Sequence, residues 1–438
     1  MARSHIEAFI ARAQERSLRV GVVGLGYVGL PLALRCVQAG YSVTGFDIDP
    51  DKVQALSEGR SYILHIGSER VAQARNAGMQ ATIDFSLVAG MDALLICVPT
   101  PLTRHREPDM TFIFNTMEQL RPHLQAGQLV VLESTTYPGT TEEDLKPRLE
   151  AAGFEIGSTL FLGFSPERED PGNPSFSTQT IPKIVSGVTP DCLRAVTALY
   201  EAVVDQVVPV SSPRVAEMTK LMENIHRAVN IGLVNEMKIA ADRMGVDIHE
   251  VIAAAATKPF GFVPYRPGPG LGGHCIPIDP FYLTWKAREY GVHTRFIELA
   301  GEINSAMPDW VMTKISDALN ARSLPLRGSR ILVLGLAYKK NIDDLRLSPS
   351  VQLLERLRDH GADYAYHDPH VPVFPKLREH RFDLRSVALD AATLSAYDCV
   401  ILATDHDCFD YPWLQQHARL IVDTRGRFVQ PFDNVVRA

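Results

Sequence analysis

The sequence predicts a mixed α/β protein in which two sheet-containing regions flank a helical one. Short apolar runs alternate with helical patterns near both ends of the chain, and a stretch poor in helix breakers fills the middle. Strands that alternate with helices favour parallel sheets covered by helices. We therefore expect an N-terminal α/β domain at residues 1–210, a central helical domain at 211–322 and a smaller C-terminal α/β domain at 323–438.

Length and composition are consistent with this arrangement. The chain has 438 residues, of which 46% are hydrophobic and 22% charged, as in a globular protein of two or three domains. The formal net charge of -7 argues against a nucleic-acid-binding protein, because such surfaces are usually basic. No stretch has the uninterrupted apolar length of a membrane span, and the N-terminus does not have the pattern of a secretory signal.

The six cysteines are scattered, without a CxxC pair or the Cys/His spacing of a metal site. We expect no metal centre and no disulfide framework. Free cysteines are typical of a reducing compartment, which favours the cytoplasm. Except for Cys275, the cysteines stand in apolar or helical contexts, and we expect them to be small buried hydrophobic residues.

In the first region, the run from Leu18 to Val23 ends at glycines, and a helical pattern follows to Gln38, with Gly40 placed to terminate it. The further strands that we expect are Tyr41 to Phe46, Ala93 to Val98, Leu129 to Leu132, Leu160 to Phe164 and Lys183 to Ser186.

In the central region, Pro213 to Gly245 predicts one long helix. Its apolar positions recur at helical spacing, and we expect them to pack into the core, although the helix could instead pair across a two-fold axis. These positions are Val215, Met218, Leu221, Met222, Ile225, Val229 and Leu233. A Gly/Pro-rich segment (Pro259 to Pro280) and a further helix (Phe296 to Ile315) follow.

The third region contains strand patterns at Arg330 to Leu336, Cys399 to Ala403 and Leu420 to Asp423, and a helix at Ser350 to His360. Gly335 stands where a second phosphate-binding loop would begin, but the later glycines of such a loop are missing.

A dinucleotide-binding fingerprint lies between the first strand and its helix. Gly24, Gly26 and Gly29 follow the G-x-G-x-x-G spacing: the first permits a tight turn, the second lets the backbone approach a pyrophosphate, and the third lets helix and strand pack closely. Asp47 ends the second strand, where a carboxylate binds the ribose hydroxyls of NAD and repels the 2′-phosphate of NADP. Asp49 is the rival acid. The first domain is thus predicted to be a Rossmann NAD-binding domain.

A glycine-rich segment that ends in a cysteine is the second candidate site. Residues 268–280 read GPGLGGHCIPIDP, and glycines let the backbone pass close to a ligand. Cys275 is either a nucleophile or a bystander with about even odds on its own. His274 could be a base, a ligand contact or a packing residue. Asp279 shares a face with Cys275 if a helical turn begins at the cysteine.

Three further polar residues stand at informative positions. Lys220 and Asn224 lie four residues apart on the long helix, hence on one face, and a lysine on a largely buried helix needs a partner. Glu167 follows a strand end, where α/β proteins gather their catalytic groups.

These elements together resemble the UDP-glucose/GDP-mannose dehydrogenase family over nearly the whole chain. The matching motifs, in order, are GLGYVGLPLA, FDID, CVPTP, ESTTYPGTT, SPERED, the Lys220–Asn224 helix, GGHCIPIDP, GLAYKKNIDDLRLSPS and VDTRG. The forms VPTPLTRHREPD (98–109) and GGHCIPIDP are most similar to the branch that acts on UDP-N-acetylhexosamines, since His274 replaces the serine typical of the UDP-glucose and GDP-mannose enzymes.

The resemblance implies a role for each matched residue. Cys275 would be the nucleophile; Lys220, Asn224 and Asp279 would hold the oxygen of the reacting carbon and the hydrolytic water. Glu167 and Thr135 would position that water or the substrate, although the segment 165–172 departs from the better-known UDP-glucose form and leaves Glu169 as an alternative to Glu167. Asp279 could act as a base or orient Lys220.

The resemblance also implies two sets of binding residues. Those for NAD are Gly24, Gly26, Tyr27, Val28, Gly29, Asp47, Lys52, Pro99, Thr100, Thr135 and Arg346. Those for the UDP-sugar are Glu167, Lys220, Asn224, Tyr265, Gly272, Gly273, Tyr338, Lys339 and Arg425. The third domain would bind the UDP-sugar, and the central one would carry catalytic groups and the contacts of a homodimer.

The expected reaction is a four-electron oxidation of the sugar C6 alcohol to a carboxylate, through a thiohemiacetal and a thioester on Cys275, with UDP-N-acetylglucosamine as the preferred substrate. UDP-N-acetylmannosamine, UDP-N-acetylgalactosamine and UDP-glucose remain alternatives, and the product would feed a surface polysaccharide such as a lipopolysaccharide O-antigen. Two rivals are a two-electron Rossmann oxidoreductase, such as a 6-phosphogluconate or 3-hydroxyacid dehydrogenase, and a non-catalytic nucleotide-sugar-binding protein. The ratio of NADH to substrate separates these possibilities.

Overall fold

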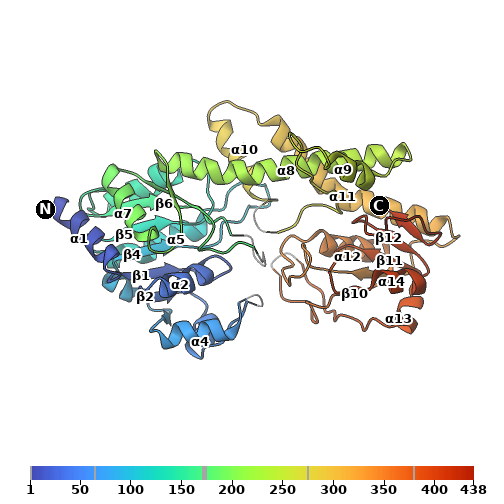
Figure 1. Cartoon of the computed structure of the whole chain (residues 1–438), viewed down its shortest axis with the longest axis horizontal. Coiled ribbons are helices and arrows are strands. Elements are labelled where there is room, and N and C mark those ends of the chain that lie inside the picture. The colour runs from blue at the N-terminus through green and yellow to red at the C-terminus, as the bar shows by residue number, and fades with distance from the viewer. Residues whose placement is uncertain (1, 64–65, 170–174, 274–275, 378–379) are drawn as a thin grey trace. The chain divides into compact units, whose positions relative to one another are not determined.

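The computed structural model describes residues 2–63, 66–169, 175–273, 276–377 and 380–438. The chain folds into two compact units, the first formed by Met1–Glu223 with Phe281–Val292 and the second by Asn224–Pro280 with His293–Ala438. Figure 1 shows helices flanking a sheet in each of them. The chain is therefore a mixed α/β protein with a parallel sheet toward each end and helices between them, as the sequence predicts.

The sheet of the first unit has eight strands in the order β3-β2-β1-β4-β5-β6-β7-β8. All neighbouring pairs are parallel except β6 and β7, which are antiparallel. The expected strands are present, and the short strands β3 and β8 are additional. The strands are β1 (Arg19–Val23), β2 (Ser42–Phe46), β3 (Gln80–Thr82), β4 (Ala93–Ile96), β5 (Leu129–Leu132), β6 (Phe161–Phe164), β7 (Lys183–Gly187) and β8 (Val207–Pro209).

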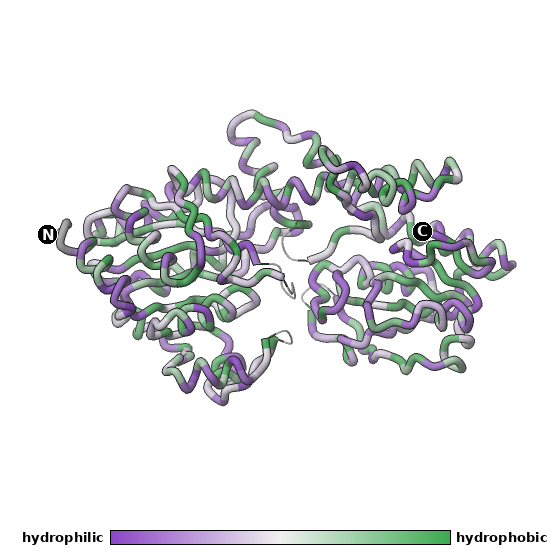
Figure 2. The backbone as a smooth tube through the Cα atoms, viewed as in Figure 1, coloured by the Kyte–Doolittle hydropathy of each residue, from purple (hydrophilic) through white to green (hydrophobic). Residues whose placement is uncertain are grey.

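Two helices of this unit begin at a capping side chain. Asp49 caps α3 by accepting the Asp51 N–H, and Thr189 caps α7 by accepting the Cys192 N–H. The helices are α1 (Ala2–Gln14), α2 (Gly29–Gln38), α3 (Pro50–Ser57), α4 (Ser68–Asn76), α5 (Thr111–Leu120), α6 (Lys146–Glu150) and α7 (Pro190–Tyr200); η1 (Phe85–Gly90), η2 (Arg121–His123) and η3 (Thr140–Leu145) are single turns. The central strands are buried along their whole length, and Figure 2 shows them as apolar.

The long helix α8 (Pro213–Arg243) runs where the sequence predicts it, but its apolar stripe is not a core stripe. Leu221 and Ile225 are buried, whereas Val215, Met218, Met222 and Leu233 are 42–62% exposed. The prediction of core packing is therefore wrong for these four residues. The reason is that the buried face of α8 carries polar side chains, among them Glu217, Lys220, Asn224, Asn235 and Lys238.

The second unit contains a parallel five-stranded sheet in the order β10-β9-β11-β12-β13. Its strands are β9 (Arg330–Leu334), β10 (Asp363–His367), β11 (Cys399–Leu402), β12 (Ile421–Asp423) and β13 (Val435–Arg437), of which β10 and β13 were not expected. Its helices are α9 (Ile248–Ala255), α11 (Arg295–Asn320), α12 (Pro349–His360), α13 (Ala391–Ser395) and α14 (Tyr411–His417); α10 (Asp279–Glu289) begins in this unit and continues into the first.

The turn after β9 is not a phosphate-binding loop. Residues 335–348 separate β9 from α12, so no helix begins at the glycine. Asp368 instead accepts the N–H groups of Leu336 at 2.7 Å and Ala337 at 3.1 Å, and it lies 3.1 Å from His406 Nε2. Burial alone would raise the pKa of Asp368, but His406 and the backbone N–H groups hold it below its ordinary value.

Of the cysteines described, Cys36, Cys97, Cys192 and Cys399 are buried as expected. Cys408 is exposed, so the prediction is wrong there, because the residue stands in the loop after β11 and not in the strand. Within the described part of the chain, no helix is long and apolar enough to cross a membrane. The same residues include no group of three or more His, Cys, Asp or Glu side chains that could hold a metal ion.

We expect Asp368→Ala to lower the free energy of unfolding of the second unit by about 3 kcal/mol, because it leaves two buried N–H groups and His406 without their acceptor. Asp390→Ala in the same unit is the control: it removes an exposed helix cap and should lower the free energy of unfolding much less. Urea unfolding of the full chain measures both. Equal losses in the two variants would contradict a special role for the buried aspartate.

Candidate functional site

The glycine turn after β1 has the geometry that the fingerprint predicts. Gly24 has φ +90° and donates its N–H to the Phe46 carbonyl at 2.7 Å. A Cβ on Gly29 would lie 1.8 Å from the Gly24 carbonyl oxygen, so only glycine allows α2 to begin there. A Cβ on Gly26 would meet nothing within 4 Å. Gly26 thus borders open space at the start of the helix.

Asp47 is buried beside this turn. Its Oδ2 accepts the Leu25 N–H at 2.8 Å and lies 3.3 Å from Lys52 Nζ, while its Oδ1 accepts the Asp49 N–H at 3.0 Å. The rival acid, Asp49, uses its own side chain to cap α3. Oδ2 of Asp47 thus accepts two hydrogen bonds, whereas Oδ1 accepts one and keeps a lone pair for a ribose hydroxyl. The open space at Gly26 and this carboxylate fit NAD, with Tyr27, Val28 and Lys52 beside them in the chain.

Three further predicted NAD contacts follow the carboxyl ends of β4 and β5. Pro99 and Thr100 come after β4, and Thr100 is buried. Thr135 comes after β5 and is half-buried. Its neighbour Ser134 donates to the Val98 carbonyl at 2.7 Å and so ties the two loops together. In an open α/β sheet these strand ends form the edge where ligands bind.

Glu167 lies just after the carboxyl end of β6 and is held by the backbone. Its Oε1 accepts the N–H groups of Arg168 and Glu169, both at 2.6 Å. Glu169 is not held in this way; burial, with Glu167 as a second cause, raises its pKa to about 7. The structure thus gives Glu167 and Glu169 different environments.

Lys220 is buried on α8, and its partner is a backbone carbonyl. Lys220 Nζ donates to the Glu167 carbonyl oxygen at 2.6 Å. Arg168 reinforces the contact, because it forms an ion pair of 2.6 Å with Glu223, one turn further along α8. At the other side of Lys220, Glu217 accepts the Gly139 N–H at 2.6 Å. α8 is therefore fixed against the loops that follow β5 and β6.

The sequence analysis missed a group of buried charged residues next to Glu167. Lys183 on β7 is buried and forms an ion pair with Glu133 at 2.6 Å. Its ammonium also lies 3.6 Å from Glu167 Oε2. A lysine that begins an otherwise apolar strand, as in the segment PKIVSG, is the signal that could have revealed it.

In the second unit, Asn224 and Asp279 form a direct pair. Asn224 Nδ2 donates to Asp279 Oδ2, and both side chains are buried. Asp279 begins α10. Cys275 and His274, four and five residues before it, lie outside the described residues, so the structure does not place the thiol or test whether it shares a face with Asp279.

The glycine run passes close to the C-terminal sheet region. A Cβ on Gly272 would lie 2.5 Å from Tyr338 Cβ, and one on Gly273 would lie 2.9 Å from the Tyr338 ring. The Gly273 N–H donates to the Arg346 carbonyl at 3.0 Å. Three of the predicted substrate residues, Gly272, Gly273 and Tyr338, are thus neighbours, and larger residues than glycine would not fit in this run.

Arg425 lies at the start of the same run. A Cβ on Gly268 would come within 2.9 Å of an Arg425 guanidinium nitrogen, and Arg425 Nε donates to the Ala403 carbonyl at 2.6 Å. Burial lowers the pKa of Arg425. Nearby, Lys238 donates to the Thr424 carbonyl at 3.2 Å, and burial lowers its pKa to about 7. The Arg425 guanidinium is a group suited to binding phosphate.

The remaining predicted residues have less specific surroundings. Lys339 is half-buried beside Tyr338. The Arg346 side chain forms an ion pair with Asp344 at 2.6 Å, which leaves its predicted contact with NAD untested. The Tyr265 hydroxyl lies 3.0 Å from His226 Nδ1.

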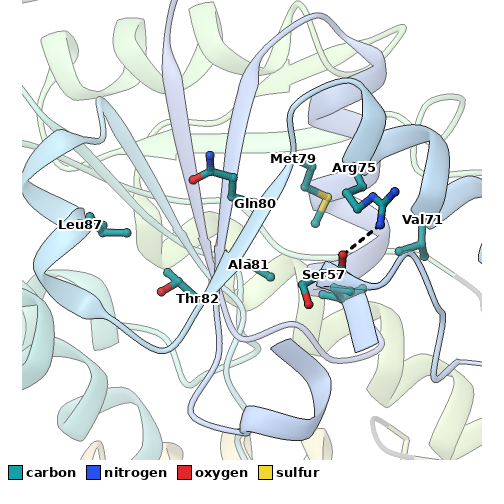
Figure 3. A pocket seen from close by; sticks show the side chains of 9 residues that line it. Ser57, Val71, Arg75, Met79, Gln80, Ala81, Thr82 and Leu87 are labelled. Atoms are coloured by element: carbon teal, nitrogen blue, oxygen red, sulfur yellow. Dashed lines mark hydrogen bonds between the residues drawn. The ribbon is translucent and has the colours of Figure 1, made fainter. Parts of the chain in front are cut away.

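One cavity of about 340 Å³ lies away from all these residues, beside the edge strand β3 (Figure 3). It is lined by Leu56, Ser57, Val71, Arg75, Met79, Gln80, Ala81, Thr82 and Leu87. None of the predicted site residues lines it. Arg75 donates to the Ser57 carbonyl at 3.1 Å across one wall. We assign it no role in the chemistry.

The arrangement in each unit indicates its chemistry. The first unit offers a dinucleotide turn, a buried ammonium and a fixed carboxylate at one sheet edge. The second offers a buried amide–carboxylate pair, a glycine run and a buried guanidinium. An ammonium and an amide can stabilise an oxyanion, a carboxylate can accept a proton from water, and a guanidinium can bind a phosphate.

Comparison with known proteins identifies three family domains in this order. Residues 18–204 match the NAD-binding domain of the UDP-glucose/GDP-mannose dehydrogenase family, residues 214–306 its central domain, and residues 332–431 its UDP-binding domain. The matches cover most of both sheets, except β8 and β13, and the long helix. The resemblance inferred from the motifs is thus confirmed by all three domains.

Individual relatives match over most of their length. The chain is 35% identical to UDP-N-acetyl-D-glucosamine 6-dehydrogenase of Pseudomonas aeruginosa, over 90% of this chain and 92% of that protein. It is 34% identical to the NDP-N-acetyl-D-galactosaminuronic acid dehydrogenase of Ralstonia nicotianae, over 93% of this chain and 95% of that protein. Its fold matches the solved UDP-D-ManNAc dehydrogenase of Pyrococcus horikoshii with a TM-score of 0.86 and 29% identity, over 96% of this chain and 98% of that one.

We expect two glycines of the turn to respond differently to alanine. Gly26→Ala should leave the melting temperature unchanged but raise the Kd for NAD+ about tenfold or more, because its methyl group would fill the space at the start of the helix. Gly29→Ala should lower the melting temperature by several degrees, because its Cβ clashes with the backbone. Thermal shift and calorimetric titration with NAD+ test both. Unchanged NAD+ affinity in Gly26→Ala would contradict the assignment.

Proposed function

Because the chain belongs to the UDP-glucose/GDP-mannose dehydrogenase family, we propose that it oxidises C6 of a UDP-N-acetylhexosamine to the uronic acid, with UDP-N-acetylglucosamine as its substrate. The observation that carries the proposal is the fixed position of Lys220. It lies against Glu167 at the sheet edge that follows the dinucleotide turn, on the same helix as Asn224. A buried ammonium at this sheet edge is suited to stabilise an oxyanion that develops on the substrate.

The choice of sugar rests on two supports. The segment 98–109 and the histidine at position 274 follow the pattern of the N-acetylhexosamine branch. The relatives named above act on the gluco, galacto and manno epimers, at similar identities. We favour the gluco epimer because its enzyme from Pseudomonas aeruginosa has the higher identity of the two curated relatives. UDP-N-acetylmannosamine, UDP-N-acetylgalactosamine and UDP-glucose are the alternative substrates.

The NAD-binding turn, Asp47, Thr100 and Thr135 would hold NAD+, which when bound supplies the acceptor for each hydride that leaves C6. The Cys275 thiolate adds to the carbon of the aldehyde and forms a thiohemiacetal. Loss of the second hydride from this carbon leaves a thioester. Sulfur is needed because the covalent adduct keeps the carbon in place for the second oxidation.

Lys220 and Asn224 would donate to the oxygen on C6 in both oxidations and in the final hydrolysis. In that hydrolysis a water oxygen bonds to the carbonyl carbon, the C–S bond breaks, and the thiolate leaves. Glu167, held by two backbone N–H groups, would orient the water and accept its proton. Asp279 would keep Asn224 pointed at the oxygen, since the two side chains are hydrogen-bonded.

The uronic acid product would serve a surface polysaccharide such as a lipopolysaccharide O-antigen. Scattered cysteines and dependence on NAD+ and a UDP-sugar favour the cytoplasm as the site of reaction.

The function is tested by counting NADH with each of four candidates: UDP-N-acetylglucosamine, UDP-N-acetylmannosamine, UDP-N-acetylgalactosamine and UDP-glucose. The wild-type enzyme should release two NADH per sugar, because the alcohol loses four electrons on the way to the carboxylate. Cys275→Ser should arrest the second half of the reaction and bring the ratio toward one or below. The proposed covalent role fails if Cys275→Ser keeps both the wild-type ratio and rate.

We also propose that the exposed stripe of α8 pairs with the same stripe of a second copy. Val215, Met218, Met222, Leu233 and Met237 recur every three or four residues, or at multiples of that spacing, and all are at least 42% exposed. A helix of 31 residues is about 45 Å long, so the stripe offers an extended apolar face. Identical stripes satisfy a two-fold axis, and such exposed apolar faces usually mark an interface.

The wild-type protein should therefore sediment as a dimer, and Met222→Glu, which introduces a charge at the stripe, should sediment as a monomer at micromolar concentration. Ile48→Glu is the matched control, because Ile48 is 71% exposed but lies in the first unit away from α8. Analytical ultracentrifugation distinguishes the forms. A monomeric wild type would contradict the pairing.

A further inference from the structure

A buried row of alternating charges lies behind Glu167. Lys183 Nζ is 2.6 Å from Glu133 Oε2 and 3.6 Å from Glu167 Oε2, and the Tyr200 hydroxyl donates to the other oxygen of Glu133. The side chains of Glu133 and Lys183 are at most 5% exposed. The proposed chemistry does not use Glu133, Lys183 or Tyr200.

The neighbouring charges in this row decide the protonation state of Lys183. Burial raises the pKa of Glu133, whereas Glu133 and Glu167 outweigh the opposite effect of burial on Lys183 and raise the pKa of its ammonium. Lys183 therefore remains charged, and it has two anionic neighbours but pairs closely with only one. Because a buried ion pair often contributes little net stability, stability alone does not explain why this strand carries a lysine.

Lys183 reaches the segment 165–167 through two different groups. Its ammonium donates to the Pro166 carbonyl at 3.3 Å and attracts the Glu167 carboxylate. The other oxygen of that carboxylate, Oε1, accepts the N–H groups of Arg168 and Glu169. The backbone carbonyl oxygen of Glu167 accepts a hydrogen bond from the Lys220 ammonium at 2.6 Å. The carboxylate and the carbonyl of Glu167 are thus each oriented by a lysine.

We propose that Lys183 is a positioning residue that acts through Pro166 and Glu167 to orient the Glu167 carboxylate for hydrolysis of the thioester. This inference rests on the proposed function, since it assumes a thioester on Cys275. Without Lys183 the carboxylate keeps its two backbone contacts at Oε1 but loses the charge that orients Oε2, and the water is activated less often. The oxidations, which need Lys220 and Asn224 but not the carboxylate, continue.

The variant that tests this is the double substitution Glu133→Gln/Lys183→Met. It removes both charges of the buried pair at once, so that no unpaired charge remains from the pair itself. Rapid mixing with NAD+ and the UDP-sugar should give a burst of NADH close to two per active site. The following steady state should slow about tenfold, with the substrate KM changed less than about twofold. Mass spectrometry of the quenched enzyme should show the acyl adduct accumulating.

Three further variants separate positioning from a purely structural role. Lys183→Arg keeps a cation at the site and should restore most of the steady-state rate. Lys183→Gln, a second variant in case the double one does not fold, can still donate to Pro166 but lacks the charge, and it should also accumulate the adduct. Lys286→Met is the matched control, because Lys286 is equally buried and pairs with Glu143 at 2.7 Å and Glu289 at 2.6 Å. It should lose stability without accumulating the adduct.

The proposal is overturned if the folded variants at position 183 slow the burst and the steady state equally, or if Lys286→Met accumulates as much adduct as they do. If the wild-type enzyme releases two NADH per sugar but the variants at position 183 accumulate no adduct, the positioning role is overturned and the proposed function remains intact. A wild type that releases no NADH with any of the four UDP-sugars overturns both.

Discussion

The hydrogen bond from the Lys220 ammonium to the Glu167 carbonyl is the contact on which the first half of the site depends. It requires α8 to bury a polar face, because a charged side chain can lie inside the unit only with its acceptor. The ion pair of Arg168 with Glu223 and the bonds from Gly139 to Glu217 hold the helix at that contact. The consequence appears on the opposite face, where Val215, Met218, Met222 and Leu233 remain exposed. The proposed catalytic contacts and the proposed dimer contacts thus lie on opposite faces of one helix.

In the second unit, the candidate site residues lie where the glycine run closely approaches other parts of the chain. Gly268, Gly272 and Gly273 contact Arg425 and Tyr338 at distances that a Cβ would not permit. These contacts place the Arg425 guanidinium and the Tyr338 ring against the glycine run. The NAD-binding turn uses the same device at Gly29. In both units, glycines thus allow a close approach of backbone or side chain that a larger residue would block.

In each sheet an aspartate directly follows a strand: Asp47 follows β2, and Asp368 follows β10. The two aspartates differ in their hydrogen-bond partners. Asp47 accepts one N–H from the glycine turn, and its Oδ1 keeps a lone pair for a ribose hydroxyl. Asp368 accepts two N–H groups from the turn after β9, and His406 occupies its remaining side. The second sheet therefore repeats the architecture of the first without its dinucleotide site, which agrees with its match to a UDP-binding domain.

The sequence by itself determined the fold class, the dinucleotide turn and the family, because these follow from patterns that neighbouring residues complete: alternating apolar runs, glycines at fixed spacing and short ordered motifs. It did not reveal β3, β8, β10 or β13, which are short or polar and lie at the edges of the two sheets, where each pairs with a single neighbouring strand. Only the tertiary structure decided which face of α8 is buried, since helical spacing shows a stripe but not its direction. The same holds for Lys183, whose partners Glu133 and Glu167 are distant in sequence and meet it only when parallel and antiparallel strands bring their ends together.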